Sequence, residues 1–199
     1  MPKQVNHEER KRLIAEATWR TISHVGIEQA SVRTIAKEAG LSLGALRYYF
    51  TTQEELLRFS MQLVQERVQE RITTIFERGG TPEETLCDVL LEVLPYAPEH
   101  QLEMQVWFQF MMSAYASQST ENPDDIYHMC HVLLTRIPDG TLRAGIDIEL
   151  ESERLAALVD GLAFHALFRP ERLPKERLRH VLVHHLNALF VRPLAIDDK

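Results

Sequence analysis

Four side chains suited to binding phosphate lie within one short segment, residues 31–50, which reads SVRTIAKEAGLSLGALRYYF. Arg33 and Arg47 are permanent cations with several N–H donors, and Tyr48 and Tyr49 add two hydroxyl donors. Arginine and tyrosine donors are typical partners of nucleic-acid phosphates. The segment therefore indicates binding to a polyanion, although the whole chain has a net charge of −7.

The charge is distributed unevenly along the chain. Residues 1–50 carry eight Lys or Arg and five Glu, a net charge of +3, and residues 51–199 carry 14 Lys or Arg and 24 Asp or Glu, a net charge of −10. We call these parts the head and the body. A mildly basic head on an acidic body is typical of a polyanion-binding module joined to a regulatory domain.

The segment that holds these side chains has the pattern of two short helices joined by a tight turn. Ser31 and Ser42 are good N-caps, and Gly40 tolerates the positive φ of the turn. Ala36 is small enough for the two helices to cross closely. This pattern predicts a helix-turn-helix, whose second helix lies in the major groove of DNA. A helical unit that serves packing alone is the alternative.

Apolar residues recur at helical spacing through nearly the whole chain, and strand-like alternation is almost absent. We therefore predict an all-α protein with a three-helix helix-turn-helix head, residues 1–50, and a body of about six helices, residues 51–199. Thr81 and Glu84 predict a capping box at the start of one body helix. The expected helices cover about residues 8–25, 31–39, 43–49, 53–78, 82–94, 99–116, 124–136, 148–168 and 174–190.

Composition excludes several classes of protein. No apolar run reaches the ~18 residues of a membrane span, and the first residues lack the apolar core of a signal peptide, so we expect a cytoplasmic protein without a membrane partner. Cys87 and Cys130 lie in apolar helical patterns and are expected to be buried free thiols. The sequence contains no GxSxG, P-loop or HExxH motif, so we predict no enzyme and no catalytic residue.

Histidine pairs are the remaining candidates for a metal site. His128 and His131, and likewise His180 and His184, have spacings that place both imidazoles on one helix face. Neither pair is completed by cysteines or carboxylates, so we predict no metal and no cofactor. A di-iron helical bundle would need paired Glu-x-x-His motifs, and the nearest match is Asp125 with His128.

The stretch SVRTIAKEAGLSLGALRYYFTTQEEL, preceded by HVGIEQA, resembles the DNA-binding head of the tetracycline-repressor (TetR) family over about residues 8–57. A weaker stretch, VDGLAFHALFRP, resembles the penultimate, dimer-forming helix of that family. The resemblance implies that phosphates contact Ser31 and Arg33 and that Tyr48 and Tyr49 pack or hydrogen-bond along the DNA backbone. The groove-facing residues that it implies are Ser42, Leu43, Gly44, Ala45 and Arg47.

The chain departs from the family pattern where family members commonly carry lysines. Leu43 and Gln53 stand at those positions, so we expect fewer neutralised phosphates and a shallower salt dependence. Leu43 and Ala45 offer apolar contact to thymine methyl groups. Arg47 is suited to a guanine edge or a phosphate.

A ligand pocket in the body is also implied by the resemblance, which places it among the fifth to eighth helices. The sixth expected helix carries methionines beside aromatic residues, a composition that suits an adaptable apolar cavity, although such a stripe is also typical of a plain core. The predicted ligand-binding residues are Met104, Trp107, Met111, Tyr127, His131 and Phe164. We expect a hydrophobic or aromatic ligand, neutral or cationic.

The last two helices are expected to form a homodimer as a four-helix bundle with twofold symmetry. The stripes expected at this seam are Leu155, Leu158, Val159, Leu162, Ala163 and Ala166 on one helix and Leu178, Val181, Leu182, Leu186 and Leu189 on the other. Packing of both stripes within their own domain is the alternative.

Together these features predict a dimeric, ligand-responsive regulator of transcription. It would bind a pseudo-palindromic double-stranded operator as a repressor and be released by a small apolar or aromatic inducer. The alternative is a DNA-binding protein whose body recruits a protein partner and has no small-molecule inducer.

Overall fold

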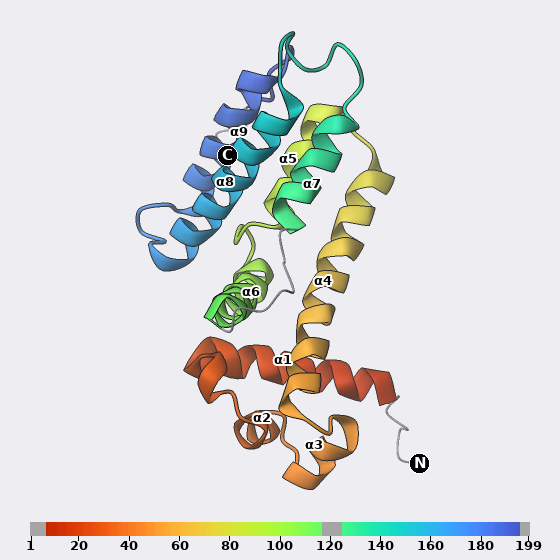
Figure 1. Cartoon of the computed structure of the whole chain (residues 1–199), viewed down its shortest axis with the longest axis vertical. Helices are drawn as coiled ribbons and strands as arrows, with labels where there is room; N and C mark the ends of the chain where they lie inside the picture. Colours follow the sequence, from red (N-terminus) through yellow and green to blue (C-terminus); the bar gives the residue numbers. More distant parts are fainter. Residues whose placement is uncertain (1–6, 117–124, 196–199) are drawn as a thin grey trace. The chain divides into compact units, whose positions relative to one another are not determined.

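Helices form all the regular elements of the described chain. The computed structural model describes residues 7–116 and 125–195, and within these ranges it contains no β-strand, only an isolated bridge between Leu142 and Phe190 (Figure 1). The predicted all-α class is confirmed. None of the described helices is long and apolar enough to cross a membrane.

The described residues form two compact units. The N-terminal unit contains residues 7–69 and 102–116, and the C-terminal unit contains residues 70–101 and 125–195. The boundary after residue 69 falls within a helix. The first part of that helix belongs to the N-terminal unit because Leu56 and Leu63 pack in the core of this unit, where Val106 also lies. The units therefore differ from the head and body expected to divide at residue 50, and that functional boundary stays a prediction.

The helices begin and end close to the expected residues. The elements are α1 (His7–Val25), the 3-10 turn η1 (Ile27–Gln29), α2 (Val32–Glu38), α3 (Leu43–Tyr49), α4 (Gln53–Arg78), α5 (Pro82–Glu92), α6 (Pro98–Ala116), α7 (Asp125–Thr135), α8 (Ile148–Phe168) and α9 (Lys175–Leu189). The capping box predicted for α5 is present, with reciprocal hydrogen bonds between Thr81 and Glu84. The turn η1 is not among the predicted elements.

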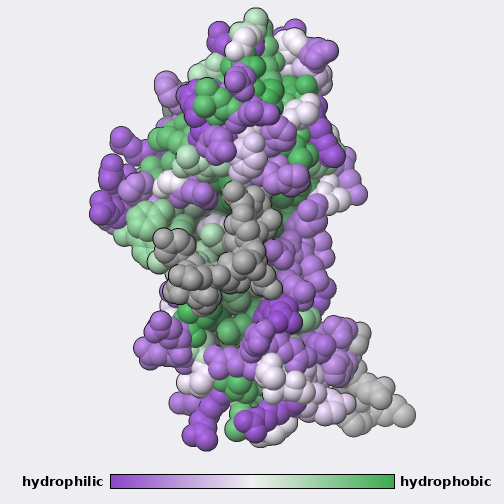
Figure 2. All heavy atoms as spheres, viewed as in Figure 1, coloured by the Kyte–Doolittle hydropathy of each residue, from purple (hydrophilic) through white to green (hydrophobic). Residues whose placement is uncertain are grey.

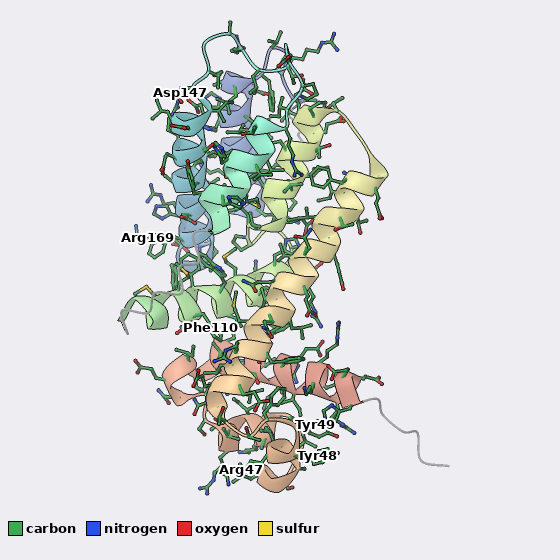
Figure 3. All side chains as sticks on the ribbon, turned by 45° about the vertical axis from the view of Figure 1, so that its right-hand side comes forward. Arg47, Tyr48, Tyr49, Phe110, Asp147 and Arg169 are labelled. Atoms are coloured by element: carbon green, nitrogen blue, oxygen red, sulfur yellow. The ribbon has the colours of Figure 1, made fainter. Side chains whose placement is uncertain are left out.

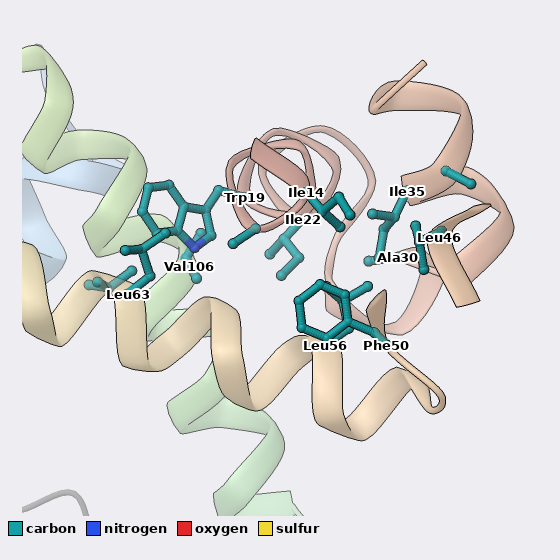
Figure 4. Close-up of a cluster of buried hydrophobic side chains, with 13 residues drawn as sticks. Ile14, Trp19, Ile22, Ala30, Ile35, Leu46, Phe50, Leu56, Leu63 and Val106 are labelled. Atoms are coloured by element: carbon teal, nitrogen blue, oxygen red, sulfur yellow. The ribbon is translucent and has the colours of Figure 1, made fainter. Parts of the chain in front are cut away.

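The N-terminal unit is organised around one apolar cluster. Figure 4 shows side chains from α1, α2, α3, α4 and α6 converging there, among them Trp19, Phe50 and Val106. Phe50, which follows α3, is 1% exposed and packs against Phe59 with ring centroids 5.3 Å apart. This cluster fixes α2 and α3 against α1 and the start of α4.

The C-terminal unit buries most of the residues that were expected at a dimer seam. The buried ones are Leu155, Val159, Leu162, Ala163, Leu178, Leu182, Leu186 and Leu189. Leu158 and Ala166 are half-buried, and Val181 is exposed. The assignment of the buried residues to a seam is wrong, because side chains already enclosed by their own chain have no surface left for a second copy.

Candidate nucleic-acid interface

Two short capped helices carry the predicted DNA contacts. The hydroxyl of Ser31 accepts a hydrogen bond from the backbone N–H of Thr34 at 3.2 Å, and that of Ser42 accepts one from Ala45 at 3.1 Å. Gly40 lies between the helices with φ 66°, in the left-handed region that glycine adopts without strain. The local sequence therefore fixes α2 and α3 as the two arms of a helix-turn-helix.

The side chains of α3 divide between core and solvent. Leu46 is fully buried, whereas Arg47 is exposed and Tyr48 is 74% exposed. Tyr49 is half-buried and packs edge-on against Tyr48, with ring centroids 5.1 Å apart. Figure 3 shows Arg47 and both tyrosines projecting from this helix. Leu46 thus anchors α3 in the core, and Arg47, Tyr48 and Tyr49 carry its hydrogen-bonding groups.

The remaining groove-facing candidates lie in the first turn of α3. Leu43 and Ala45 are half-buried, and Gly44 is exposed. A Cβ atom placed on Gly44 would meet no other atom within 4 Å, so packing inside the chain does not require a glycine there. The first turn of α3 therefore presents little steric bulk to an approaching surface.

Five of the six Lys and Arg residues that α1 and α4 contribute to the described N-terminal unit form ion pairs, and Arg10 of α1 is the exception. The ion pairs on α1 and α4 are Lys11–Glu8, Arg12–Glu66, Arg20–Glu38, Arg58–Glu54 and Arg67–Glu16. By contrast, the side chains of Arg33, Lys37 and Arg47 form no hydrogen bond or ion pair with any residue that the structure describes. Because a paired carboxylate offsets the attraction of a cation for phosphate, α2 and α3 present three cations that are not neutralised.

Lys37 is absent from the predicted DNA contacts. It is exposed on α2 and follows Arg33 by four residues, a spacing that places both side chains on one helix face. That spacing is the signal by which the sequence could have indicated it.

The helix-turn-helix is tied to α4 by polar contacts. Gln53, at the start of α4, donates a hydrogen bond to the carbonyl of Ala30 at 3.2 Å. Further along, the indole N–H of Trp19 donates to the carbonyl of Ser60 at 2.9 Å, and the Arg67 guanidinium lies 4.7 Å from the indole ring centroid. At position 53 the chain therefore has a structural amide instead of the lysine common in the family.

The predicted ligand-binding residues fall in both units. Met104, Trp107 and Met111 are half-buried on the part of α6 that belongs to the N-terminal unit. Trp107 packs edge-on against Phe108, with ring centroids 5.2 Å apart. Sulfur and aromatic groups are thus grouped on α6.

The other three predicted ligand residues belong to the C-terminal unit. Tyr127 and His131 stack on α7 with ring centroids 6.0 Å apart, and the His131 ring lies 3.4 Å from the Ser152 hydroxyl. Phe164 is 46% exposed and lies 4.8 Å from the Phe168 ring. The structure therefore brings Tyr127 and His131 together, and a single pocket formed by all six residues stays a prediction.

A polar cavity of about 340 Å³ lies elsewhere in the C-terminal unit. It is lined by Arg78, Gly79, Glu84, Thr85, Cys87, Asp88, Arg179 and Leu194, none of which is a predicted ligand residue. Arg78 and Asp88 form an ion pair across its lining.

Neither cysteine is suited to thiolate chemistry. Burial raises the pKa of the Cys87 thiol to about 11 and that of Cys130 to about 12, so both are protonated at neutral pH. Both are free and buried, as expected. The described residues include no group of three or more potential metal ligands.

A helix-turn-helix with free cations on both of its helices, within a helical chain, is typical of DNA-binding transcriptional regulators. Residues 14–58 match the family described as bacterial regulatory proteins, tetR family, and residues 82–191 match the C-terminal part of BetI-type transcriptional repressors. The chain belongs to the TetR family of transcriptional regulators and is not an enzyme.

Relatives and solved structures support the same assignment over nearly the whole chain. The regulator PksA of Bacillus subtilis is 47% identical over 96% of this chain and 95% of its own length. BetI of Stenotrophomonas maltophilia is 27% identical over 81% of this chain and 83% of its own. A regulator from Rhodococcus sp. RHA1 is 29% identical with a TM-score of 0.75, covering 92% of this chain and 99% of its own.

A second solved structure shares the fold and contains a ligand. It is a putative regulator from Saccharomonospora viridis in complex with choline, 23% identical, with a TM-score of 0.79 over 93% of this chain and 100% of its own.

Proposed function

We propose that this chain is a dimeric repressor that binds a pseudo-palindromic operator through α2 and α3 and is released by a small ligand. The observation that carries the proposal is the group of free cations, Arg33, Lys37 and Arg47, on the helix-turn-helix, while five cations of α1 and α4 are paired. Because the target is chromosomal DNA, we expect the protein to act in the cytoplasm.

The predicted contact residues have distinct roles in this proposal. Arg33 and Lys37 contact phosphates from α2, and Arg47 reaches a guanine edge or a phosphate from α3. Ser31 and Ser42 position these helices and offer phosphate contacts, and Tyr48 and Tyr49 follow the DNA backbone. Leu43, Gly44 and Ala45 present a small apolar surface, which allows the first turn of α3 to lie close to the bases of the major groove.

The salt dependence of operator binding tests this assignment. Lys37→Ala removes one phosphate contact from each head, so the slope of log K against log salt concentration should become shallower by about 2 for the dimer. Arg47→Ala should lower operator affinity by about 1–3 kcal/mol and relax the base preference at one position. Both are measured by fluorescence anisotropy with DNA from the region upstream of the protein's own gene.

Arg12→Ala is the matched control, because Arg12 is a cation of the same unit that is paired with Glu66. Its salt slope should equal that of the unmodified protein. Equal slopes for Lys37→Ala and the unmodified protein would contradict the assignment of α2 to phosphate.

The dimer is proposed to form through the outward faces of α8 and α9 instead of the buried stripes. Leu150 and Phe168 of α8 are 57% and 59% exposed, and Val181 of α9 is 36% exposed. Figure 2 shows hydrophobic side chains reaching the surface between hydrophilic ones. A Cβ on Gly161, in the middle of α8, would meet nothing within 4 Å, which leaves space for a partner helix. Twofold pairing of these faces sets the spacing of the two heads.

The proposed ligand is small and mostly apolar, neutral or cationic. The aromatic and methionine side chains on α6, and the ring stack of Tyr127 and His131 on α7, suit such a molecule. Choline, which is bound to the Saccharomonospora viridis regulator, is a small cation, and it is therefore the first compound to test as a ligand of this protein.

We expect choline to release the operator at lower concentrations than its neutral carbon isostere, dimethylbutanol. The concentration that releases half of the operator should be lower for choline by about fivefold or more, because a cation over an aromatic face gains about 1 kcal/mol or more in binding free energy. Trp107→Leu should abolish the difference between the two compounds, as measured by operator anisotropy during titration.

Leu57→Met, a change on α4 outside the predicted pocket, serves as the control and should preserve the preference. If neither compound, nor a screen of apolar and aromatic amines, changes operator binding, the alternative that the body recruits a protein partner is favoured.

A further inference from the structure

Three aromatic rings join the start of α1 to the end of α3. The His7 imidazole centroid lies 4.9 Å from the Tyr49 ring and 5.9 Å from the Tyr48 ring, and the two tyrosines are perpendicular at 5.1 Å. His7 and Tyr48 are both exposed. Figure 3 shows both tyrosines near the end of α1 at which the chain enters this helix. The imidazole therefore packs against two side chains that are proposed to contact the DNA backbone.

Among the described residues, charged and titratable groups come near this cluster from α1, α3 and α4, and Arg10 follows His7 by three residues on α1. On α1, the Glu8 carboxylate lies 3.6 Å from the His7 Nδ1 atom, and the Lys11 ammonium lies 3.8 Å from the same carboxylate. On α3, the neighbours are the two tyrosines and, next in the chain, Arg47. At the start of α4, Glu55 interacts electrostatically with Lys11.

An imidazolium ion at this position would have two aromatic faces and one carboxylate as neighbours. Aromatic faces attract a cation within about 6 Å of the ring centroid, and a carboxylate attracts it directly. Histidine is the side chain that changes charge between pH 5 and pH 8. A lower pH would thus add a cation beside Tyr48 and Tyr49.

We propose that His7 is a positioning residue for Tyr48 and Tyr49 and, when protonated, a pH-dependent phosphate contact that strengthens operator binding as the pH falls. The proposal rests on the proposed function, since it requires that α3 contacts DNA. Neutral imidazole supports the tyrosines by packing alone. The imidazolium ion adds one neutralised phosphate for each head.

The test compares the salt dependence of operator binding at pH 8.0 and pH 5.5 for the unmodified protein, His7→Phe and His7→Ala. For the unmodified protein, the slope of log K against log salt concentration should be steeper by about 2 at pH 5.5, and affinity at ~0.1 M salt should rise on the order of tenfold. His7→Phe keeps an aromatic ring without the charge. It should lose this part of the pH dependence.

His7→Ala should weaken binding severalfold at both pH values, because the tyrosines lose the ring that supports them. The other histidines, including His24 of the same unit, are unchanged in all three proteins, so the difference from His7→Phe isolates His7. An identical pH dependence of the salt slope in the unmodified protein and His7→Phe would overturn the proposal.

Operator binding at pH 8.0 separates this proposal from the function on which it rests. If the unmodified protein binds the operator and Arg47→Ala weakens binding, but the His7 variants behave like the unmodified protein, the His7 proposal alone is wrong. If no saturable binding to the upstream DNA occurs at either pH, both are wrong. Circular dichroism at the two pH values confirms that each variant is folded.

Discussion

Replacing Trp19 with alanine is expected to lower the free energy of unfolding of the N-terminal unit by about 3–5 kcal/mol. Trp19 is 2% exposed, and its ring lies in the cluster that packs α1 against α4 and α6. Removing it leaves a cavity, and the structure around a cavity relaxes only partly. It also removes the indole donor to Ser60 and the ring beneath Arg67.

Urea unfolding measures this change. The sequence contains two tryptophans, so the variant retains Trp107 on α6 as a fluorescent reporter in the same unit. Trp19→Phe is the control: it keeps most of the apolar volume and loses the N–H donor, so its loss should be about 1–2 kcal/mol. A loss below about 1 kcal/mol for Trp19→Ala would show that Trp19 does not hold this unit together.

Gly161→Arg is expected to convert the proposed dimer to monomers and to reduce operator affinity by two orders of magnitude or more. A Cβ atom at this position would meet nothing within 4 Å in its own chain, and we therefore expect the variant to fold. A charged side chain in the middle of a helical seam would separate the partner helices and leave a cation without a partner. A monomer binds one half-site and loses the high effective concentration of the second head.

Sedimentation velocity and operator anisotropy, measured on the same preparation, test this prediction. The control is Gln65→Arg, which adds the same charge at an exposed position of α4 and should leave the oligomeric state unchanged. If Gly161→Arg sediments like the unmodified protein, the outward face of α8 is not the seam.

The sequence alone was sufficient to predict the helices and the helix-turn-helix. Ser31, Gly40 and Ser42 act on residues within one turn of themselves, and the helical period is a property of neighbouring residues. The same holds for the capping box of Thr81 and Glu84. These features depend on short-range geometry, so they can be read without knowledge of the rest of the chain.

The tertiary structure decided which surfaces remain available. Leu155 and Leu150 are both leucines of α8, and only packing against other helices shows that the first is buried and the second exposed. Arg12 and Lys37 are both cations of the same unit, and only the fold brings Glu66, 54 residues away, to the first. The ring of His7 likewise meets Tyr48 through folding alone. Availability to DNA or to a second chain depends on neighbours distant in sequence, and the local pattern carries no information about them.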